Sequence, residues 1–285
     1  MSLIDLFNSD EIKVETWDDC KDKFKQFAEQ HRALNQQNDG NASELLFRGL
    51  PNSCYELTTT LDRDVSGKRI SIEDYHEAIK MILPEVETLT GRLWKMPSYQ
   101  EVDGWLANSG FFEKSDFPGY DYMVYLRHHG FPSPLLDWTT SPFIAAFFAL
   151  KEICANAHHV AIHIYLADTG DNGGGKSHEG PHPQIVNLGR YARSHARHFL
   201  QQSRYTLCTR VEDGTRYFAR HHDVISERTP RQDLHCKIII PCSQRLRALK
   251  ELDSLNINAF SLMGSEESLM HTMALREFHF RDWRL

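Results

Sequence analysis

The chain has 285 residues, of which 41% are apolar, and its 39 acidic residues outnumber 32 Lys and Arg, for a formal net charge of −7. This composition is typical of a soluble globular protein with one large domain or two small ones, and it excludes collagen-like and largely disordered chains. No apolar run approaches the roughly 18–20 residues of a membrane helix, and the N-terminus shows no secretory signal, so we expect no contact with a membrane. Six scattered cysteines without a CxxC pair favour a cytoplasmic protein with reduced thiols.

The N-terminal part of the chain predicts a long helix and then a strand. Residues 16–36 predict the helix, because Thr16 can cap it and apolar side chains recur near helical spacing. A polar stretch leads into residues 44–50, an apolar segment that we expect to be a strand running into a turn. We therefore divide the chain into an N-terminal helical extension, 1–42, and a main domain, 43–285.

The rest of the chain intersperses predicted helices and strands. We expect helices at 71–93, 122–129 and 142–156, strands at 159–167, 205–211 and 237–242, irregular segments at 105–120 and 168–183, and a turn with a final helix or strand at 256–285. The third of these helices starts at Pro142, where the missing N–H of proline costs nothing. Because no repeat and no steady βαβ rhythm is present, the predicted fold class is α+β.

Sixteen histidines are many for a chain of this length, and three adjacent pairs occur among them. They form no HExxH motif and do not combine with cysteines at zinc-finger spacing, so we expect no metal site. The motifs GxSxG, GxGxxG and GxxxxGK[ST] are absent as well. A hydrolase of phosphorylated ligands that uses the histidines is therefore our last-ranked interpretation.

One segment is basic within this acidic chain. Nine arginines, no lysine and four acids lie between Arg190 and Arg231. Arginine binds phosphate and carboxylate groups in a bidentate manner, so the segment predicts contact with RNA or DNA. The alternative, which the sequence leaves open, is a solvated face that pairs with the acidic remainder of the protein.

Two sequence blocks are distinctive. The first is Phe47-Arg48-Gly49, and the second, at residues 125–142, reads YLRHHGFPSPLLDWTTSP and leads into an apolar helix. Together the two blocks resemble the FRG domain family. Two weaker blocks follow at 197–205, where Ser203 replaces the usual glycine, and at 256–269, where Glu267 keeps the second of two expected acids. The family name by itself implies no activity.

A more distant resemblance, to ADP-ribosyltransferases of the Arg–Ser–Glu type, implies a mechanism. Those enzymes have an aromatic-Arg-Gly strand, then a strand that ends in Ser/Thr residues, then a helix with Ala and Phe on one face, and finally a glutamate. The chain repeats this order with Arg48, with Thr139 and Ser141, and with Glu266 or Glu267. The resemblance implies a split-sheet core with flanking helices, and NAD as the substrate.

Breaking the nicotinamide–ribose bond of NAD requires that the diphosphate is held and that a developing positive charge is stabilised. The resemblance implies catalytic roles for Arg48, Ser141 and Glu267, and NAD-binding roles for Arg48, Gly49, His129, Thr139, Ser141 and Gln201. It also implies an acceptor, either a nucleic acid such as RNA or a protein. Bacterial proteins of this type often act as toxins or in defence against phage, which implies a neutralising antitoxin partner.

Each of these residues also has a structural interpretation, which the sequence leaves open. Arg48 would pair with Asp137, while Asp137 and Trp138 would lock the fold. The hydroxyls of Thr139 and Ser141 would cap the helix at Pro142, and His129 would end the helix before it. The two glutamates would be ordinary acids in a first helical turn. The alternative function is accordingly a non-catalytic module that binds a nucleotide or nucleic acid.

Overall fold

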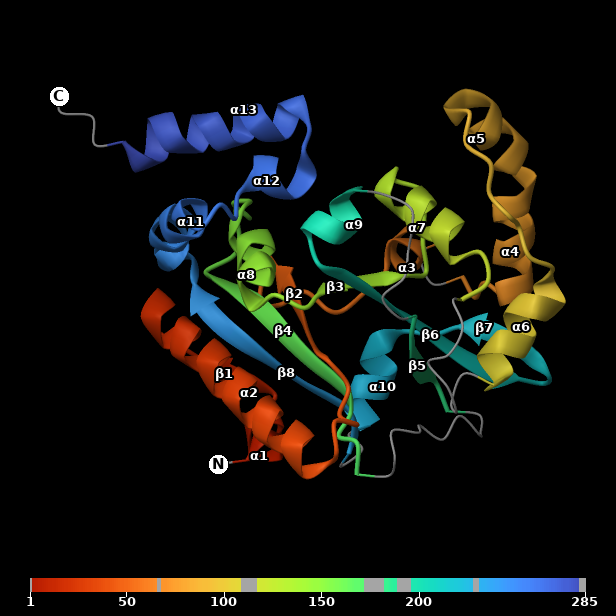
Figure 1. Cartoon of the computed structure of the whole chain (residues 1–285), viewed down its shortest axis with the longest axis horizontal. Helices are drawn as coiled ribbons and strands as arrows, with labels where there is room; N and C mark the ends of the chain where they lie inside the picture. The colour runs from red at the N-terminus through yellow and green to blue at the C-terminus, as the bar shows by residue number, and fades with distance from the viewer. Residues whose placement is uncertain are drawn as a thin grey trace.

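The computed structural model describes residues 2–65, 68–108, 117–171, 182–188, 196–227 and 231–281, and within them it shows an α+β fold with an eight-stranded mixed sheet (Figure 1). The predicted fold class is confirmed. The strands are β1 Glu11–Lys13, β2 Leu45–Leu50, β3 Leu136–Thr139, β4 His159–Asp168, β5 Gln184–Asn187, β6 Ser203–Glu212, β7 Thr215–Phe218 and β8 Gln232–Pro241. The helices are α1 Leu3–Phe7, α2 Trp17–Gln37, α3 Thr60–Asp64, α4 Ile72–Met81, α5 Leu83–Thr90, α6 Tyr99–Asn108, α7 Tyr120–His128, α8 Pro142–Leu150, α9 Ala196–Leu200, α10 His221–Glu227, α11 Arg245–Ser254, α12 Ala259–Met263 and α13 Glu266–Leu275, with a 3₁₀ turn at Cys242–Gln244 and a π turn at Arg276–Phe280.

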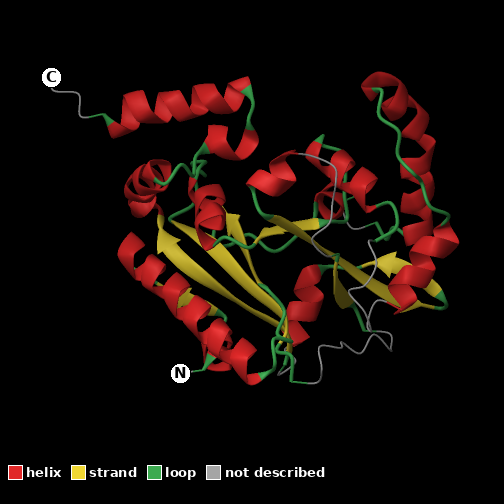
Figure 2. Cartoon of the chain, in the orientation of Figure 1, coloured by secondary structure: helices red, strands yellow, loops and turns green. Residues whose placement is uncertain are grey.

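The sheet has the order β1-β8-β4-β2-β3-β6-β5, and β7 pairs with β6 (Figure 2). The β1–β8 pair is parallel and the other pairs are antiparallel. The junction between β2 and β3 is the weakest in register, because Phe47 opposite Thr139 is its one aligned pair. By contrast, β2 stays aligned with β4 along its whole length. The sheet is therefore loosely joined in its middle, between the strand that carries Arg48 and the strand that carries Asp137.

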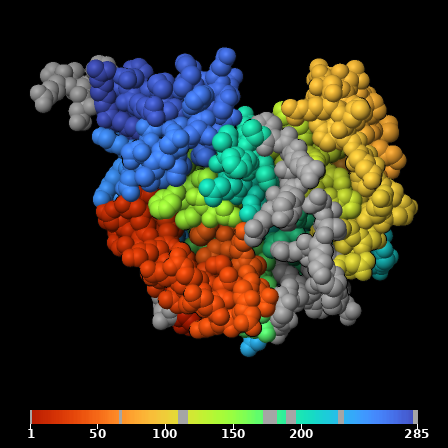
Figure 3. All heavy atoms as spheres, viewed as in Figure 1, coloured from red at the N-terminus to blue at the C-terminus, as the bar shows by residue number. Residues whose placement is uncertain are grey.

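The N-terminal segment is part of the main core. Helix α2 begins after Thr16, whose side chain accepts a hydrogen bond from the Asp19 N–H, so the predicted cap is confirmed. Residues 1–42 are not helical throughout, since they also supply β1, which aligns with β8. Trp17 on α2 is fully buried, and its Nε1 donates to Glu251 on α11 at 2.9 Å. The N-terminal and C-terminal segments thus lie side by side on one face of the molecule (Figure 3).

Three predicted elements differ from the structure. The helix expected at 71–93 is two helices, α4 and α5, because Pro84 has no N–H to donate to the preceding turn. The segment expected to be irregular at 105–120 includes the end of α6 and the start of α7, while residues 109–116 lie outside the described residues. Helix α8 ends at Leu150 instead of near 156. The expected loop at 168–183 lies mostly outside the described residues.

The buried apolar side chains form three clusters on and around the sheet. The largest packs α1, α2, α8 and α11 on β2, β4 and β8. The second lies beneath α4, α6 and α7, and the third is built around Trp138 and Tyr165, whose rings stack with centroids 5.3 Å apart. No helix among the described residues is both long enough and apolar enough to span a membrane.

Candidate ligand-binding site

A cavity of about 390 Å³ lies among β2, β3, the start of β6, the end of α3 and one side of α8. We name it the Arg48 cavity. Three basic side chains, Arg48, Arg63 and Lys151, and two acidic ones, Asp137 and Glu152, take part in its lining. Phe148 and Ala145 of α8 form an apolar wall. The cavity therefore combines cationic groups with an apolar surface, which is the combination that small charged ligands with a ring system require.

The Phe-Arg-Gly sequence places its three residues in different roles along β2. Phe47 is buried in the core, where its ring lies 6.4 Å from that of Phe24 on α2. Arg48, the next residue, contributes its side chain to the Arg48 cavity. At Gly49 a Cβ atom would lie 1.9 Å from the carbonyl oxygen of Ala145 and 2.5 Å from the N of Ala149. Glycine is thus required at position 49 because α8 crosses β2 at this point.

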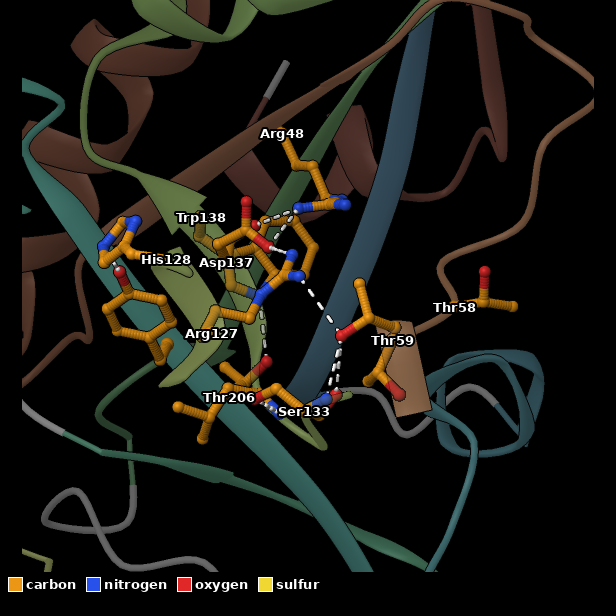
Figure 4. Close-up of polar contacts among 12 residues, drawn as sticks. Arg48, Thr58, Thr59, Arg127, His128, Ser133, Asp137, Trp138 and Thr206 are labelled. Carbon is orange, nitrogen blue, oxygen red and sulfur yellow. Dashed lines mark hydrogen bonds and ion pairs between the residues drawn. The ribbon is translucent and has the colours of Figure 1, made fainter. Parts of the chain in front are cut away.

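Arg48 shares the carboxylate of Asp137 with a second arginine, Arg127 on α7 (Figure 4). Its Nη1 lies 3.0 Å from Asp137 Oδ1 and donates to the Asp137 carbonyl at 2.6 Å. Arg127 Nη2 donates to the same Oδ1, and its Nη1 donates to Thr60 Oγ1 at 3.2 Å. The predicted pairing of Arg48 with Asp137 is confirmed. Burial opposes ionisation of Asp137, but the charges of Arg127 and Arg48 outweigh it and hold its pKa well below the usual range.

Arg63 adds a third guanidinium to this cluster. It follows the first turn of α3, and its Nη1 donates to the carbonyl and the hydroxyl of Thr58 at 3.0 and 3.3 Å. Partial burial and the positive charges of Arg48 and Arg127 lower the pKa of Arg63. Arginine stays charged in proteins, so the lowered pKa reflects first the cost of partial burial and then repulsion from the other two cations, opposed by Asp137 and Asp62. Three guanidinium groups and the one carboxylate of Asp137 give this part of the site an excess of positive charge.

Thr139 and Ser141 use their hydroxyls within the fold. Thr139 Oγ1 donates to the carbonyl of Gln201 at 2.7 Å and accepts from the N–H of Ser141 at 3.1 Å. Ser141 caps α8, since its Oγ accepts from the Ile144 N–H at 3.3 Å. Thr139 and Gln201 take part in lining the Arg48 cavity, whereas Ser141 does not. The predicted capping role of Ser141 is confirmed, and the Thr139 bond holds β3 to the start of β6.

His129 lies at the C-terminal end of α7, as its structural interpretation predicts, and its ring packs against that of Tyr125 in a tilted arrangement with centroids 4.2 Å apart. Partial desolvation of the ring and the charges of Arg197 and Arg92 lower its pKa, so its neutral form is favoured. The preceding His128 contacts the hydroxyl of Tyr205 through Nε2 at 2.9 Å. Neither histidine takes part in lining the Arg48 cavity.

The structure does not bring Glu267 to the Arg48 cavity. Glu266 and Glu267 are exposed in the first turn of α13, and neither takes part in lining the cavity. Hydrogen bonds from its own backbone N–H and from Ser265 lower the pKa of Glu267, as is typical at a helix N-terminus. The carboxylates that do line the cavity are those of Asp137 and Glu152, and Glu152 is 65% exposed and lies 2.8 Å from Lys151 Nζ.

Most described arginines of the 190–231 segment are held in internal contacts. Arg204 pairs with Glu44 at 2.8 Å, and Arg216 with Asp103 at 2.9 Å. Arg210 pairs with Glu212, and Arg231 lies 3.4 Å from Asp171. The segments that contain Arg190, Arg193 and Arg228 lie outside the described residues. In the described part of the chain, no three His, Cys, Asp or Glu side chains gather in a way that could hold a metal ion.

Sequence reasoning missed Arg63, Arg127, Lys151 and Glu152. Arg127 lies inside the 125–142 block, so its position within that block was an available signal. Arg63 follows a Thr-Thr-Leu-Asp stretch that starts the short helix α3, and nothing in that pattern indicates proximity to Arg48. Lys151 and Glu152 follow a very apolar helix, where charged residues are expected as ordinary solvated ends.

Comparison with known families gives one match: residues 43–158 match the model of the FRG domain. This range contains β2, α3, β3 and α8, so it covers most of the wall of the Arg48 cavity and all of the arginine cluster. The resemblance predicted from the Phe-Arg-Gly sequence and the 125–142 block is confirmed. Comparisons with curated proteins and with solved structures give no significant match.

Proposed function

We propose that this chain, which carries an FRG domain at residues 43–158, binds NAD in the Arg48 cavity and transfers its ADP-ribose group to a macromolecule. The observation that carries the proposal is that Arg48 and Arg127 share the carboxylate of Asp137, while Arg63 adds a third guanidinium to the same cavity. Guanidinium groups bind phosphate oxygens in a bidentate manner, and a partly buried site strengthens that attraction. A diphosphate would supply negative charge to offset this excess of cations.

The other walls of the Arg48 cavity suit the remaining parts of a dinucleotide. Phe148 and Ala145 offer an apolar surface for a base or for nicotinamide, while Thr139, Gln201 and Ser203 are polar residues of the same lining. Arg48 and Thr139 lie on adjacent strands that meet at the Phe47–Thr139 pair. This placement keeps the order of the Arg–Ser–Glu resemblance for its first two elements.

In the proposed reaction the bond between ribose C1′ and the nicotinamide nitrogen breaks, and nicotinamide leaves with the electron pair. A nucleophile of the acceptor forms the new bond to C1′ and loses its proton to solvent. The positive charge that develops on the ribose needs a nearby anion. Glu152 is the cavity carboxylate that is not shared between two arginines, and its contact is with the single cation Lys151.

The proposed acceptor is a cytoplasmic macromolecule, which is RNA, DNA or protein. The paired arginines of the 190–231 segment are already bound to acidic side chains within the fold, so they do not add to the affinity for nucleic acid. A toxin or anti-phage role with a neutralising antitoxin follows from the family resemblance alone.

A second candidate function is a nucleotide-binding module without catalysis. The placement of Glu267 outside the Arg48 cavity favours it, because the third residue of the Arg–Ser–Glu order is not brought to the first two. Such a module would use the same arginine cluster and leave NAD intact.

One experiment separates the two functions. Nicotinamide release from NAD would be measured for the wild type, Arg48→Ala, Glu152→Gln and Glu267→Gln, without acceptor, with RNA and with a cell lysate. The transferase predicts release that Arg48→Ala abolishes, and labelled NAD then identifies the acceptor. NAD binding without release under all three conditions would establish the binding module. A folded protein that neither binds nor cleaves NAD would refute both.

A further inference from the structure

We propose that Arg63 is a second phosphate ligand of the Arg48 cavity and makes the site selective for doubly charged phosphoryl groups over singly charged ones. This inference rests on the phosphate-binding function proposed above and names a residue that decides its specificity. The ligand class is a group with at least two negative charges, either the diphosphate bridge of a dinucleotide, which has two, or free pyrophosphate, which has more than two at neutral pH. A lone phosphodiester, with one negative charge, is the class that the site would bind poorly.

The first argument is the position of Arg63. It takes part in lining the cavity together with Arg48, and the oxygens that accept from its Nη1 belong to Thr58. Among the described residues no carboxylate forms an ion pair with it, whereas Arg48 and Arg127 both reach Asp137. In the described part of the chain, Arg63 is therefore the arginine of the cluster that has no ion-pair contact, although Asp137 and Asp62 attract it at longer range.

The second argument is the balance of charge. Arg48 and Arg127 share the single carboxylate of Asp137, and Arg63 lines the same cavity as Arg48. Partial burial, followed by the charges of Arg48 and Arg127, lowers the pKa of Arg63, while Asp137 and Asp62 act in the opposite direction. Positive charge therefore exceeds negative charge at this end of the cavity. A ligand with one negative charge would leave part of this repulsion in place, whereas a ligand with two would remove it.

The third argument is the rigidity of the segment that carries Arg63. Thr59 caps α3 through Asp62, and the N–H of Leu61 donates to the Ser133 carbonyl at 3.0 Å. Thr60 Oγ1 accepts from Ser133 N at 2.9 Å and from Arg127 Nη1 at 3.2 Å. Arg127 thus connects α3 directly to Asp137, as the dashed contacts around Ser133 and Arg127 show in Figure 4. A preorganised cation binds a ligand with less loss of side-chain entropy.

Calorimetric titration tests the inference with two defined probes, inorganic pyrophosphate and the singly charged dimethyl phosphate. The variants are Arg63→Gln, Arg63→Lys and, as a matched control, Arg247→Gln, whose arginine is exposed on α11 and pairs with Asp18. The wild type is expected to prefer pyrophosphate. Arg63→Gln should weaken pyrophosphate binding about tenfold or more and dimethyl phosphate binding much less, because a charged hydrogen bond and one full charge are lost. Arg63→Lys should recover part of the loss, and Arg247→Gln should change nothing.

The outcomes separate this inference from the proposed function. Pyrophosphate binding that is equal in the wild type and Arg63→Gln, at unchanged unfolding temperatures, would overturn the inference, as would equal losses for both probes. If Arg63→Gln unfolds, the lysine variant decides, because a binding deficit in a folded Arg63→Lys protein supports the inference and wild-type affinity contradicts it. Pyrophosphate selectivity without NAD binding would support the inference and refute the proposed function. NAD binding with the same affinity in the wild type and Arg63→Gln would support the proposed function and refute the inference.

Discussion

Replacing Gly49 with alanine should destabilise the protein strongly, because the new methyl group has no space. Its carbon would lie 1.9 Å from the Ala145 carbonyl oxygen and 2.5 Å from the Ala149 N, both in the backbone of α8. A tolerable carbon–oxygen contact is about 3.3 Å, so relieving the 1.9 Å contact would require α8 to move away from β2 by about 1.4 Å. Overpacking of this kind costs about 1–3 kcal/mol, and a clash with backbone belongs near the upper end.

The assay is thermal and urea unfolding of Gly49→Ala beside Gly104→Ala. Gly104 lies within α6, and a Cβ there would meet nothing within 4 Å. Alanine at 104 should be neutral or stabilising by up to about 1 kcal/mol, since it favours the helix. A loss of about 3 kcal/mol at position 49 corresponds to an unfolding temperature lower by roughly 6–12 °C. Equal unfolding temperatures for the two variants would refute the packing role of Gly49.

Three further predictions concern the contacts of Asp137 and Trp138. Asp137→Asn should lower the free energy of unfolding in urea by about 2–4 kcal/mol, which is less than for a fully buried pair because the carboxylate is 44% exposed. An unchanged urea midpoint would contradict the shared ion pair. The pKa of Asp137 is lowered in the folded state, so its contribution to the free energy of unfolding is complete above about pH 4, the unfolded value, and is lost as the pH falls further. The loss of stability in acid should therefore be smaller in Asp137→Asn than in the wild type. Trp138→Phe removes the Nε1 bond to Thr206 Oγ1, 2.9 Å long, and should cost about 1–3 kcal/mol, whereas Trp94→Phe, at a partly buried site, is the control that should cost less.

The sequence predicted the parts of the site that follow one another along the chain. Phe47-Arg48-Gly49 is on a strand as expected, and Ser141 and Pro142 open α8, because caps, strand alternation and first-turn proline are local effects. The pairing of Arg48 with Asp137 joins two separate sequence blocks, and the sequence supports it as one of two interpretations of these residues. Local patterns also predict the start of α2. They do not predict that the helix expected at 71–93 divides at Ile82, where Pro84, two residues later, lacks the N–H that would continue the helical hydrogen bonds.

The rest depended on long-range placement, for which the sequence has no local signal. Strand β1 has three residues and exists because it aligns with β8 near the far end of the chain. Arg63 and Glu152 join the Arg48 cavity through the packing of α3 and α8, and neither belongs to a periodic pattern. Glu267 follows Arg48 and Ser141 in the expected order along the chain, but it does not line the Arg48 cavity. The order of residues along a chain does not decide which of them meet in space.

The central claim is that the Arg48 cavity binds the diphosphate of NAD, and a crystal structure of the protein with NAD tests it most directly. The account predicts diphosphate density between Arg48 and Arg63, with a ring of the ligand against Phe148. Density at another surface, or a diphosphate that contacts neither arginine, would contradict the account.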